Sequence, residues 1–190
     1  MELILKKSLE EKDFIHACIC KETWALKKLY EDHYSMMYPM CMRYANNNDD
    51  ALDILHDGFI KVFNNLEKYQ VGTSLIAWIK RIMVNTAIDY YRKETRRRTT
   101  DLDHVLDITN DEPDVISAMT AEELLEALQK LSPAYRSVFN MYVIEGYSHR
   151  ELAEQLGITE STSRSNLVKA RHKLKEIITA RMEFSIKNAD

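Results

Sequence analysis

The residues best suited to chemistry form a row of cations and small polar groups near the C-terminal end of the sequence. The segment from Glu160 to Lys175 contains five Lys and Arg residues and one acidic residue. Side chains of these types on one helix can donate hydrogen bonds to phosphates and to base edges. The candidate residues are Thr162, Arg164, Ser165, Asn166, Lys169, Arg171 and Lys173. The predicted chemistry is recognition of DNA, and the alternative is a solvated basic helix in an ordinary bundle.

The stretch before this row has the residue types of a helix-turn-helix. Ser148 and Glu151 stand at the spacing of a capping box, which predicts the start of a helix. Ala153 is small enough for close helix approach, and Gly157 can adopt the left-handed conformation of a tight turn. Ile158 follows as an apolar anchor for the turn. Residues at these fixed spacings favour the DNA-binding motif over the plain basic helix.

The second helix of the motif is expected to begin near Thr159 and to bury Leu167, Ala170 and Leu174. Its polar side then matches a recognition helix in the major groove. Ser163 stands where such motifs usually carry a small apolar residue. We expect this serine to loosen the packing at the start of the helix.

Charge is distributed unevenly along the chain. The net charge of −4 argues against binding to phosphates, which requires cations. However, seven Lys and Arg residues oppose two acidic residues between Trp78 and Arg98. The segment from Thr99 to Glu123 holds eight acidic residues and no Lys or Arg. Two basic blocks therefore flank an acidic one, and each basic block can meet DNA separately.

Enzyme chemistry is not indicated. His56 with Asp53 and Asp57 offers acid and base groups, but they fall on one helix without the signal of a pocket. The chain has no glycine-rich phosphate loop and no nucleophile motif. We predict that the protein is not an enzyme and has no cofactor.

The three cysteines do not suit a disulfide framework. His16, Cys18 and Cys20 could be metal ligands, but residues two apart on a helix point in different directions. We interpret them as packing residues and predict no metal site. A redox or metal role for Cys18, Cys20 or Cys41 stays open.

The elements that position these groups are expected to be helices throughout. Only four glycines and three prolines interrupt a chain rich in good helix formers. In the segment 49–69, apolar residues recur at three- and four-residue steps: Leu52, Leu55, Phe59, Val62, Phe63 and Leu66. The opposite side carries Asp53, Asp57, Lys61 and Asn64.

A turn at Gly72, with Thr73 or Ser74 as N-cap, is predicted to open the next helix at about Leu75. Its expected core residues are Leu75, Ile79, Ile82, Met83 and Ile88. Its expected surface mixes aromatic, polar and cationic groups: Trp78, Lys80, Arg81, Asn85, Asp89 and Arg92. Trp78 can equally be a core tryptophan, and Asn85 can cap or bridge helices.

The fold class is therefore all-α, with two small helical domains joined by a flexible acidic linker. Ser132 and Pro133 mark a helix start within the second domain, and Gly146 the end of that helix. The predicted boundaries are 1–98, linker 99–117, second domain 118–182 and tail 183–190. No run of about 20 apolar residues is present. We expect a cytoplasmic protein without stable membrane insertion.

Taken together, the motifs resemble the extracytoplasmic-function (ECF) sigma factors of the sigma-70 family. The resemblance rests on LYEDHYSMMYPMCMRY, DDALDILHDGFIKVF, AWIKRIMVNTAIDYYRK and LSPAYRSVFNMYVIEGYSHRELAEQLGIT, in that order around an acidic linker. It covers about residues 22–178. It implies a sigma region 2 bundle, a sigma region 4 helix-turn-helix, and a factor that directs core RNA polymerase to promoters.

The resemblance also implies roles for particular residues. Region 2 would bind the beta-prime clamp helices through Asp53, Asp57, Lys61 and Asn64, unless these are merely a solvated face. It would recognise and melt the minus-10 element through Trp78, Lys80, Arg81, Asn85, Arg92, Arg96 and Arg97, and the loop 70–74 would hold a flipped base. Arg96, Arg97 and Arg98 are best interpreted as nonspecific phosphate contacts.

Region 4 would read the minus-35 element and contact the beta flap. Asn166 stands where many members carry Arg, so the base preference does not transfer. The acidic linker would thread polymerase channels that otherwise hold RNA, or serve as a plain tether. An anti-sigma factor is an expected partner.

Two other functions remain as alternatives. A ligand-responsive helix-turn-helix regulator would bind palindromic duplex as a dimer without polymerase. An adaptor or anti-sigma-like protein acting through protein contacts alone would tolerate loss of Arg164 and Lys169 without weaker DNA binding.

Overall fold

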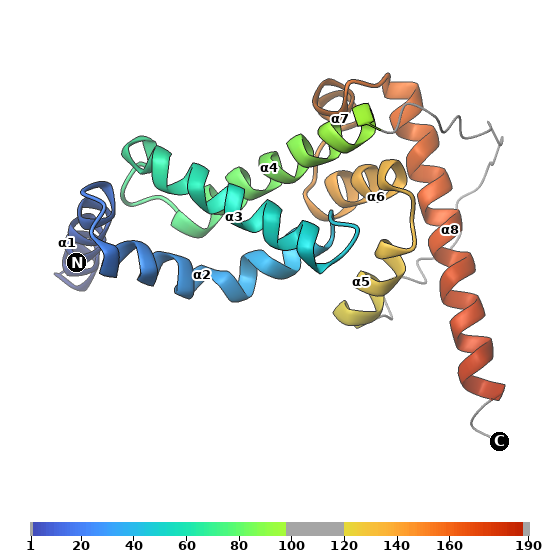
Figure 1. The fold of residues 1–190 in the computed structure, drawn as a ribbon, viewed down its shortest axis with the longest axis horizontal. Helices are drawn as coiled ribbons and strands as arrows, with labels where there is room; N and C mark the ends of the chain where they lie inside the picture. Colours follow the sequence, from blue (N-terminus) through green and yellow to red (C-terminus); the bar gives the residue numbers. More distant parts are fainter. Residues whose placement is uncertain (1, 98–119, 188–190) are drawn as a thin grey trace. The chain divides into compact units, whose positions relative to one another are not determined.

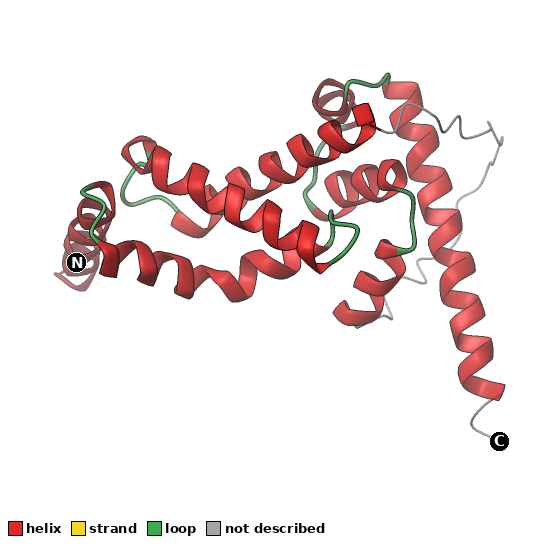
Figure 2. Ribbon diagram, in the orientation of Figure 1, coloured by secondary structure: helices red, strands yellow, loops and turns green. Residues whose placement is uncertain are grey.

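The computed structural model describes residues 2–97 and 120–187. Every regular element in these two ranges is helical, as Figure 2 shows, so the all-α prediction is confirmed. Contacts divide the chain into two compact units, 1–87 and 88–190. The predicted linker, 99–117, lies outside the described residues.

The first unit is built on α1 (Glu2–Ile19), α2 (Thr23–Met42) and α3 (Asn48–Asn65), followed by the short 3-10 turn η1 (Leu66–Lys68). Helix α2 packs against both α1 and α3 (Figure 1). The side chain of Asn47 accepts a hydrogen bond from the backbone N–H of Asp50 at 2.8 Å and so caps α3. On α3, Leu55, Phe59 and Val62 are buried as predicted. Leu66 in η1 is also buried, while Leu52 and Phe63 are half-buried.

Helix α4 (Leu75–Arg97) begins where the sequence predicts. The Ser74 hydroxyl accepts a hydrogen bond from Ala77 N at 3.3 Å, so Ser74 is the N-cap. Gly72 has φ +88°, a left-handed conformation that the turn requires. Of the expected core residues of α4, Ile79, Met83 and Ile88 are buried, whereas Leu75 and Ile82 are half-buried.

The second unit includes the C-terminal part of α4, from Ile88, and its next described helices are α5 (Ala121–Gln129) and α6 (Pro133–Phe139). Thr120 and Glu123 form a capping box at α5, and Ser132 with Pro133 starts α6 as predicted. The helical segment ends before Gly146, which has φ +77°, as predicted, but its last part is a π-helical segment, η3 (Asn140–Ile144). The side chain of Asn140 is fully buried at this change of helix type.

Helix α7 (His149–Leu156) and helix α8 (Glu160–Lys187) complete the second unit. Helix α8 packs against α5, α6 and α7. Its buried apolar residues are Leu167, Ala170, Leu174 and Ile178, so the predicted core side of this helix is confirmed. The helix-turn-helix is thus held by contacts along most of the length of α8.

Candidate nucleic-acid interface

The turn between α7 and α8 is fixed by local hydrogen bonds. Ser148 and Glu151 form the predicted capping box, in which Ser148 N donates to the Glu151 carboxylate at 2.8 Å. These bonds hold the pKa of Glu151 below its ordinary value, the backbone bond being the larger cause. Gly157 adopts φ +69° and ψ 34°, and its N–H donates to Ala153 O at 3.0 Å. The capping box and the left-handed glycine of the predicted motif are therefore both present.

The Thr159 side chain caps α8. Its hydroxyl accepts a hydrogen bond from Thr162 N at 3.0 Å and contacts the Thr162 hydroxyl at 2.8 Å. Helix α8 then begins at Glu160, in agreement with the predicted start near Thr159.

The candidate DNA-contacting side chains of α8 are open to solvent to different degrees. Thr162, Arg164, Ser165, Arg171 and Lys173 are exposed, while Asn166 and Lys169 are half-buried. The buried side of the same helix faces its own unit, so the polar side is the one that a ligand can meet. We call these seven residues the α8 surface.

Two cations of the α8 surface are held by acids of the same helix. Arg164 pairs with Glu160 at 2.6 Å, and Lys173 pairs with Glu176 at 2.8 Å. Exposed pairs of this kind contribute at most about 1 kcal/mol. A phosphate can therefore replace either carboxylate at small cost.

Ser163 is the point where the structure differs from the expectation of loose packing. Its side chain is fully buried, and its hydroxyl lies 2.8 Å from Nδ1 of His149. The His149 ring in turn stacks on Tyr142, with ring centroids 4.4 Å apart. A buried hydroxyl costs little when it is hydrogen-bonded, so the packing is satisfied by polar groups. The sequence prediction did not include His149.

On α4, the predicted minus-10 residues fall on a helix that is partly covered. Arg81 and Asn85 are exposed, while Trp78, Lys80 and Arg92 are half-buried. Arg96 and Arg97 lie within the last turn of this helix. We call these seven residues the α4 surface.

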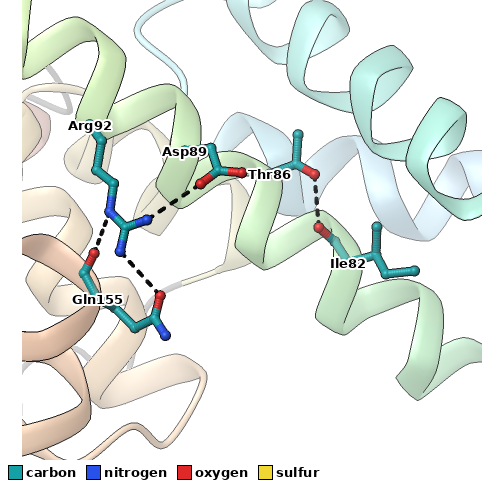
Figure 3. Close-up of polar contacts among 5 residues, drawn as sticks. All are labelled: Ile82, Thr86, Asp89, Arg92 and Gln155. Carbon is teal, nitrogen blue, oxygen red and sulfur yellow. Dashed lines mark hydrogen bonds and ion pairs between the residues drawn. The ribbon is translucent and has the colours of Figure 1, made fainter. Parts of the chain in front are cut away.

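Two contacts within α4 stabilise its middle turns (Figure 3). Arg92 pairs with Asp89 at 3.5 Å, and the Thr86 hydroxyl donates to Ile82 O at 2.9 Å. Thr86 thereby satisfies its hydroxyl while its side chain remains buried.

The loop 70–74 is held by Tyr69, a residue that the sequence prediction missed. The Tyr69 hydroxyl lies 2.7 Å from both Thr73 O and the carboxylate of Glu11. Its ring packs on Trp78, with centroids 5.5 Å apart. Burial, followed by the bond to Glu11, raises the pKa of Tyr69 above its ordinary value. Trp78 is therefore both a packing residue and partly open to solvent.

On α3, Asp53, Asp57 and Asn64 are exposed, and Lys61 is half-buried. We call these four residues the α3 surface. His56 lies 3.5 Å from the Tyr30 hydroxyl and 26 residues away from it in the sequence.

All three cysteines are thiols outside any disulfide. Burial raises the pKa of Cys18 to about 11 and that of Cys41 to about 12. Cys20 is exposed, with its sulfur 3.7 Å from Nε2 of His16. Among the described residues, no group of three or more His, Cys, Asp or Glu side chains could hold a metal ion.

The all-α fold, the helix-turn-helix and the cations of α8 are typical of a DNA-binding protein. Two family models match the chain: "Sigma-70 region 2" over residues 29–97 and "Sigma-70, region 4" over residues 121–174. Together they cover more than half of the sequence, in the order that the motifs indicate. The chain belongs to the sigma-70 family and, within it, to the ECF group.

Curated relatives agree with this membership. The chain is 30% identical over 156 residues to ECF RNA polymerase sigma factor SigE of Mycolicibacterium smegmatis, which covers 80% of this chain and 60% of that protein. It is 27% identical over 164 residues to RNA polymerase sigma factor YlaC of Bacillus subtilis, covering 84% and 95%. It is 22% identical over 168 residues to ECF RNA polymerase sigma factor SigM of Mycobacterium tuberculosis, covering 88% and 84%.

Solved structures with a similar chain include CnrH in complex with the cytosolic domain of CnrY, at 20% identity and a TM-score of 0.46, covering 90% of this chain and 97% of that one. Another is the sigma factor RpoE in complex with the anti-sigma factor NepR from Bartonella quintana, at 20% identity and a TM-score of 0.48. That match covers 80% of this chain and 96% of the other.

The protein is accordingly a transcription initiation sigma factor, and the ligand-responsive regulator is not favoured. Sigma factors bind core RNA polymerase and promoter DNA, and they are non-catalytic DNA-binding initiation factors. Within the described ranges, no helix is both long and apolar enough to span a membrane.

Proposed function

We propose that this sigma factor recognises two elements of a promoter through two of its helices, α8 and α4, and binds core polymerase through a third helix, α3. The proposed domains are region 2 at 1–98 and region 4 at 118–182, joined by the linker 99–117 and followed by a tail at 183–190. The observation that carries the proposal is the α8 surface, a polar and cationic side on a helix that directly follows a helix-turn-helix turn.

The α8 surface is proposed to read the minus-35 duplex. Arg164, Ser165, Asn166 and Lys169 are assigned to base edges or nearby phosphates, and Arg171 and Lys173 to phosphates. Thr162 lies in the first turn of α8, where recognition helices commonly approach the bases. The same domain is proposed to contact the beta flap of the polymerase.

The α4 surface is proposed to recognise and melt the minus-10 element. Opening a duplex costs roughly 1 to 2 kcal/mol per base-pair step, and a factor without ATP must recover this by binding the exposed strand. Arg81 and Asn85 are exposed for such contacts, and the loop 70–74 lies against Tyr69 next to Trp78. An ordered loop with aromatic side chains suits a base that has left the stack.

The α3 surface is proposed to bind the beta-prime clamp helices. Asp53 and Asp57 are exposed one turn apart, followed by half-buried Lys61 and exposed Asn64. Four residues at steps of three or four share one side of a helix, so a partner helix can meet all of them.

Further parts of the proposal concern the linker and the cell. The acidic linker is proposed to enter the RNA channels of the polymerase, an anti-sigma factor to hold the protein inactive, and the protein to act in the cytoplasm. We further propose that it has no bond-forming activity of its own, since the polymerase supplies the chemistry. These assignments rest on membership in the ECF group.

In vitro transcription with core polymerase on a library of randomised promoters tests the proposal. We expect transcripts whose templates share two short motifs separated by a fixed spacing. A protein that neither binds core polymerase nor starts transcription from any template would overturn the assignment.

Single substitutions then test the surfaces one at a time. Lys169→Ala should weaken binding to the selected upstream duplex about tenfold, whereas Lys175→Ala, on another side of the same helix, is the matched control. Asn85→Ala should impair melting, measured by permanganate reactivity, and leave core binding unchanged. Asn48→Ala, an exposed asparagine at the start of α3, is its control.

A third substitution separates the protein interface from the DNA interfaces. Asp57→Ala should weaken core polymerase binding, while the exposed acid Glu67 supplies the matched control Glu67→Ala. Equal loss of core binding by Lys169→Ala and Asn85→Ala would indicate misfolding and would contradict the separate surfaces.

A further inference from the structure

The hydrogen bond between His149 and Ser163 joins two points of the chain that determine where the recognition helix lies. His149 is the first residue of α7, and Ser163 lies in the first turn of α8. The bond of 2.8 Å therefore connects the starts of the two helices across the tight turn, 14 residues apart in the sequence. It is a side-chain hydrogen bond between α7 and α8.

Three features make this contact directional. Ser163 is fully buried, so its hydroxyl cannot exchange His149 for a water molecule. The His149 ring is stacked on Tyr142 of η3 with an interplanar angle of 23°, which restricts the ring. A hydrogen bond also fixes direction, whereas an apolar contact tolerates sliding and rotation. A rotation of α8 about its axis would therefore stretch or break this bond.

The position of Ser163 connects this contact to the DNA-facing residues. Thr162 and Arg164 are its immediate neighbours, and Asn166 lies one turn further along the helix. Because base recognition requires donors and acceptors in fixed positions, a small rotation of this turn changes which base edge each side chain meets.

We propose that His149 is a positioning residue for promoter reading, which sets the rotation of the recognition helix through Ser163. The proposal rests on the proposed role of the α8 surface in reading duplex DNA. It assigns to the His149–Ser163 pair an effect on discrimination between sequences, separate from general affinity for DNA.

The protonation state of His149 gives a second readout. Groups around the ring that carry or acquire charge are Arg164, Arg171 and Glu160 on α8 and Tyr142 on η3. Burial is the main cause that lowers the pKa of His149 below its ordinary value, the two arginines lower it further, and Glu160 opposes them. The folded protein thus disfavours the imidazolium form. Stability from this group is present above the ordinary histidine pKa and decreases as the pH falls toward the lowered pKa.

The experiment compares four proteins: wild type, His149→Ala, Ser163→Ala and the double variant. Each is bound to core polymerase, and its affinity is measured for the upstream duplex selected from the library and for a scrambled duplex. We expect each single variant to lower the ratio of the two affinities about fivefold, the equivalent of one ordinary hydrogen bond. The double variant should be no worse than either single one, because both remove the same interaction.

Conservative replacement separates positioning from packing. His149→Asn can present an oxygen near the place of Nδ1 and should restore most of the discrimination, whereas His149→Gln places its amide further out and should not. Lowering the pH from 7.5 to 5.5 should also decrease the thermal midpoint of the wild type more than that of His149→Asn.

The outcomes distinguish the inference from the proposed function. If Lys169→Ala leaves duplex binding unchanged, the DNA role of α8 itself fails. If Lys169→Ala weakens binding but the His149 and Ser163 variants keep the wild-type ratio, or lose both affinities equally, the positioning role alone is overturned.

Discussion

A close contact between α3 and α4 predicts an unusual response to a small substitution. Gly58 is buried on α3, and a Cβ atom added there would lie 2.2 Å from Sδ and 3.1 Å from Cε of Met83 on α4. Favourable contacts between such atoms begin at about 3.5 Å. Gly58→Ala therefore forces the Met83 side chain, which is itself fully buried, out of its position.

Two effects of opposite sign decide the size of the change. Alanine stabilises a helix interior by about 1 kcal/mol relative to glycine. Overpacking of a core costs about 1 to 3 kcal/mol. We expect a net loss of about 1 kcal/mol for Gly58→Ala. In a Met83→Ala background the collision is removed, so the same substitution should stabilise the protein by about 1 kcal/mol.

Denaturant unfolding followed by tryptophan fluorescence measures this change. Both tryptophans of the chain, Trp24 and Trp78, lie in the first unit, so the signal reports that unit alone. Gly72→Ala is the control, because Gly72 has φ +88° and an added Cβ meets nothing within 4 Å. Its cost should be the same with and without Met83→Ala. Stabilisation by Gly58→Ala in the wild-type background, or an equal effect in both backgrounds, would refute the reasoning.

Three further predictions concern the turn and the thiols. Gly157→Ala should lower the free energy of unfolding by about 1 kcal/mol, because φ +69° strains any residue with a Cβ. Thermal unfolding measures this loss, and an equal loss from a Gly→Ala substitution at a position with helical φ would contradict the explanation. Ser148→Ala should cost about 1 kcal/mol through loss of the cap. Because the pKa of Glu151 is lowered, the stability it contributes is present above the ordinary glutamate pKa and lost as the pH falls through the lowered value; Ser148→Ala should reduce this loss. Thiol labelling of the folded protein at pH 8 should modify Cys20 rapidly and the two buried cysteines only on unfolding, and rapid labelling of all three would overturn their assignment to the core.

The parts of the site that could be predicted from the sequence are those fixed by neighbours in the chain. The capping box of Ser148 and Glu151 spans three residues, and the left-handed Gly157 depends on the backbone alone. The buried side of α8 follows from its periodicity, since Leu167, Ala170 and Leu174 recur at steps of three and four. Local rules of this kind fix where a recognition helix begins and which side it presents.

The parts that could not be predicted depend on contacts across longer separations. Tyr69 orders the loop before α4 through Thr73 and through Glu11, which is 58 residues away. His149 satisfies Ser163 across the turn, so a residue that looked like a packing defect is a hydrogen-bonded one. The π-helical segment at Asn140 likewise follows no local signal in the sequence. Pattern rules do not report which distant group will meet a given side chain.

The ion pairs of α8 affect how strongly its cations can bind DNA phosphates. Arg164 and Lys173 each lie against an acid of their own helix, and Arg181 pairs with Glu126 of α5 at 2.5 Å. In each exchange with a phosphate, the gain from the new contact is reduced by the loss of the old pair, which is worth at most about 1 kcal/mol. Contacts from Ser165 and Asn166 to base edges are not reduced in this way, because these neutral side chains form no ion pair with a carboxylate. We therefore expect discrimination by this helix to depend on its exact placement more than on its charge, which is the property that the His149–Ser163 bond controls.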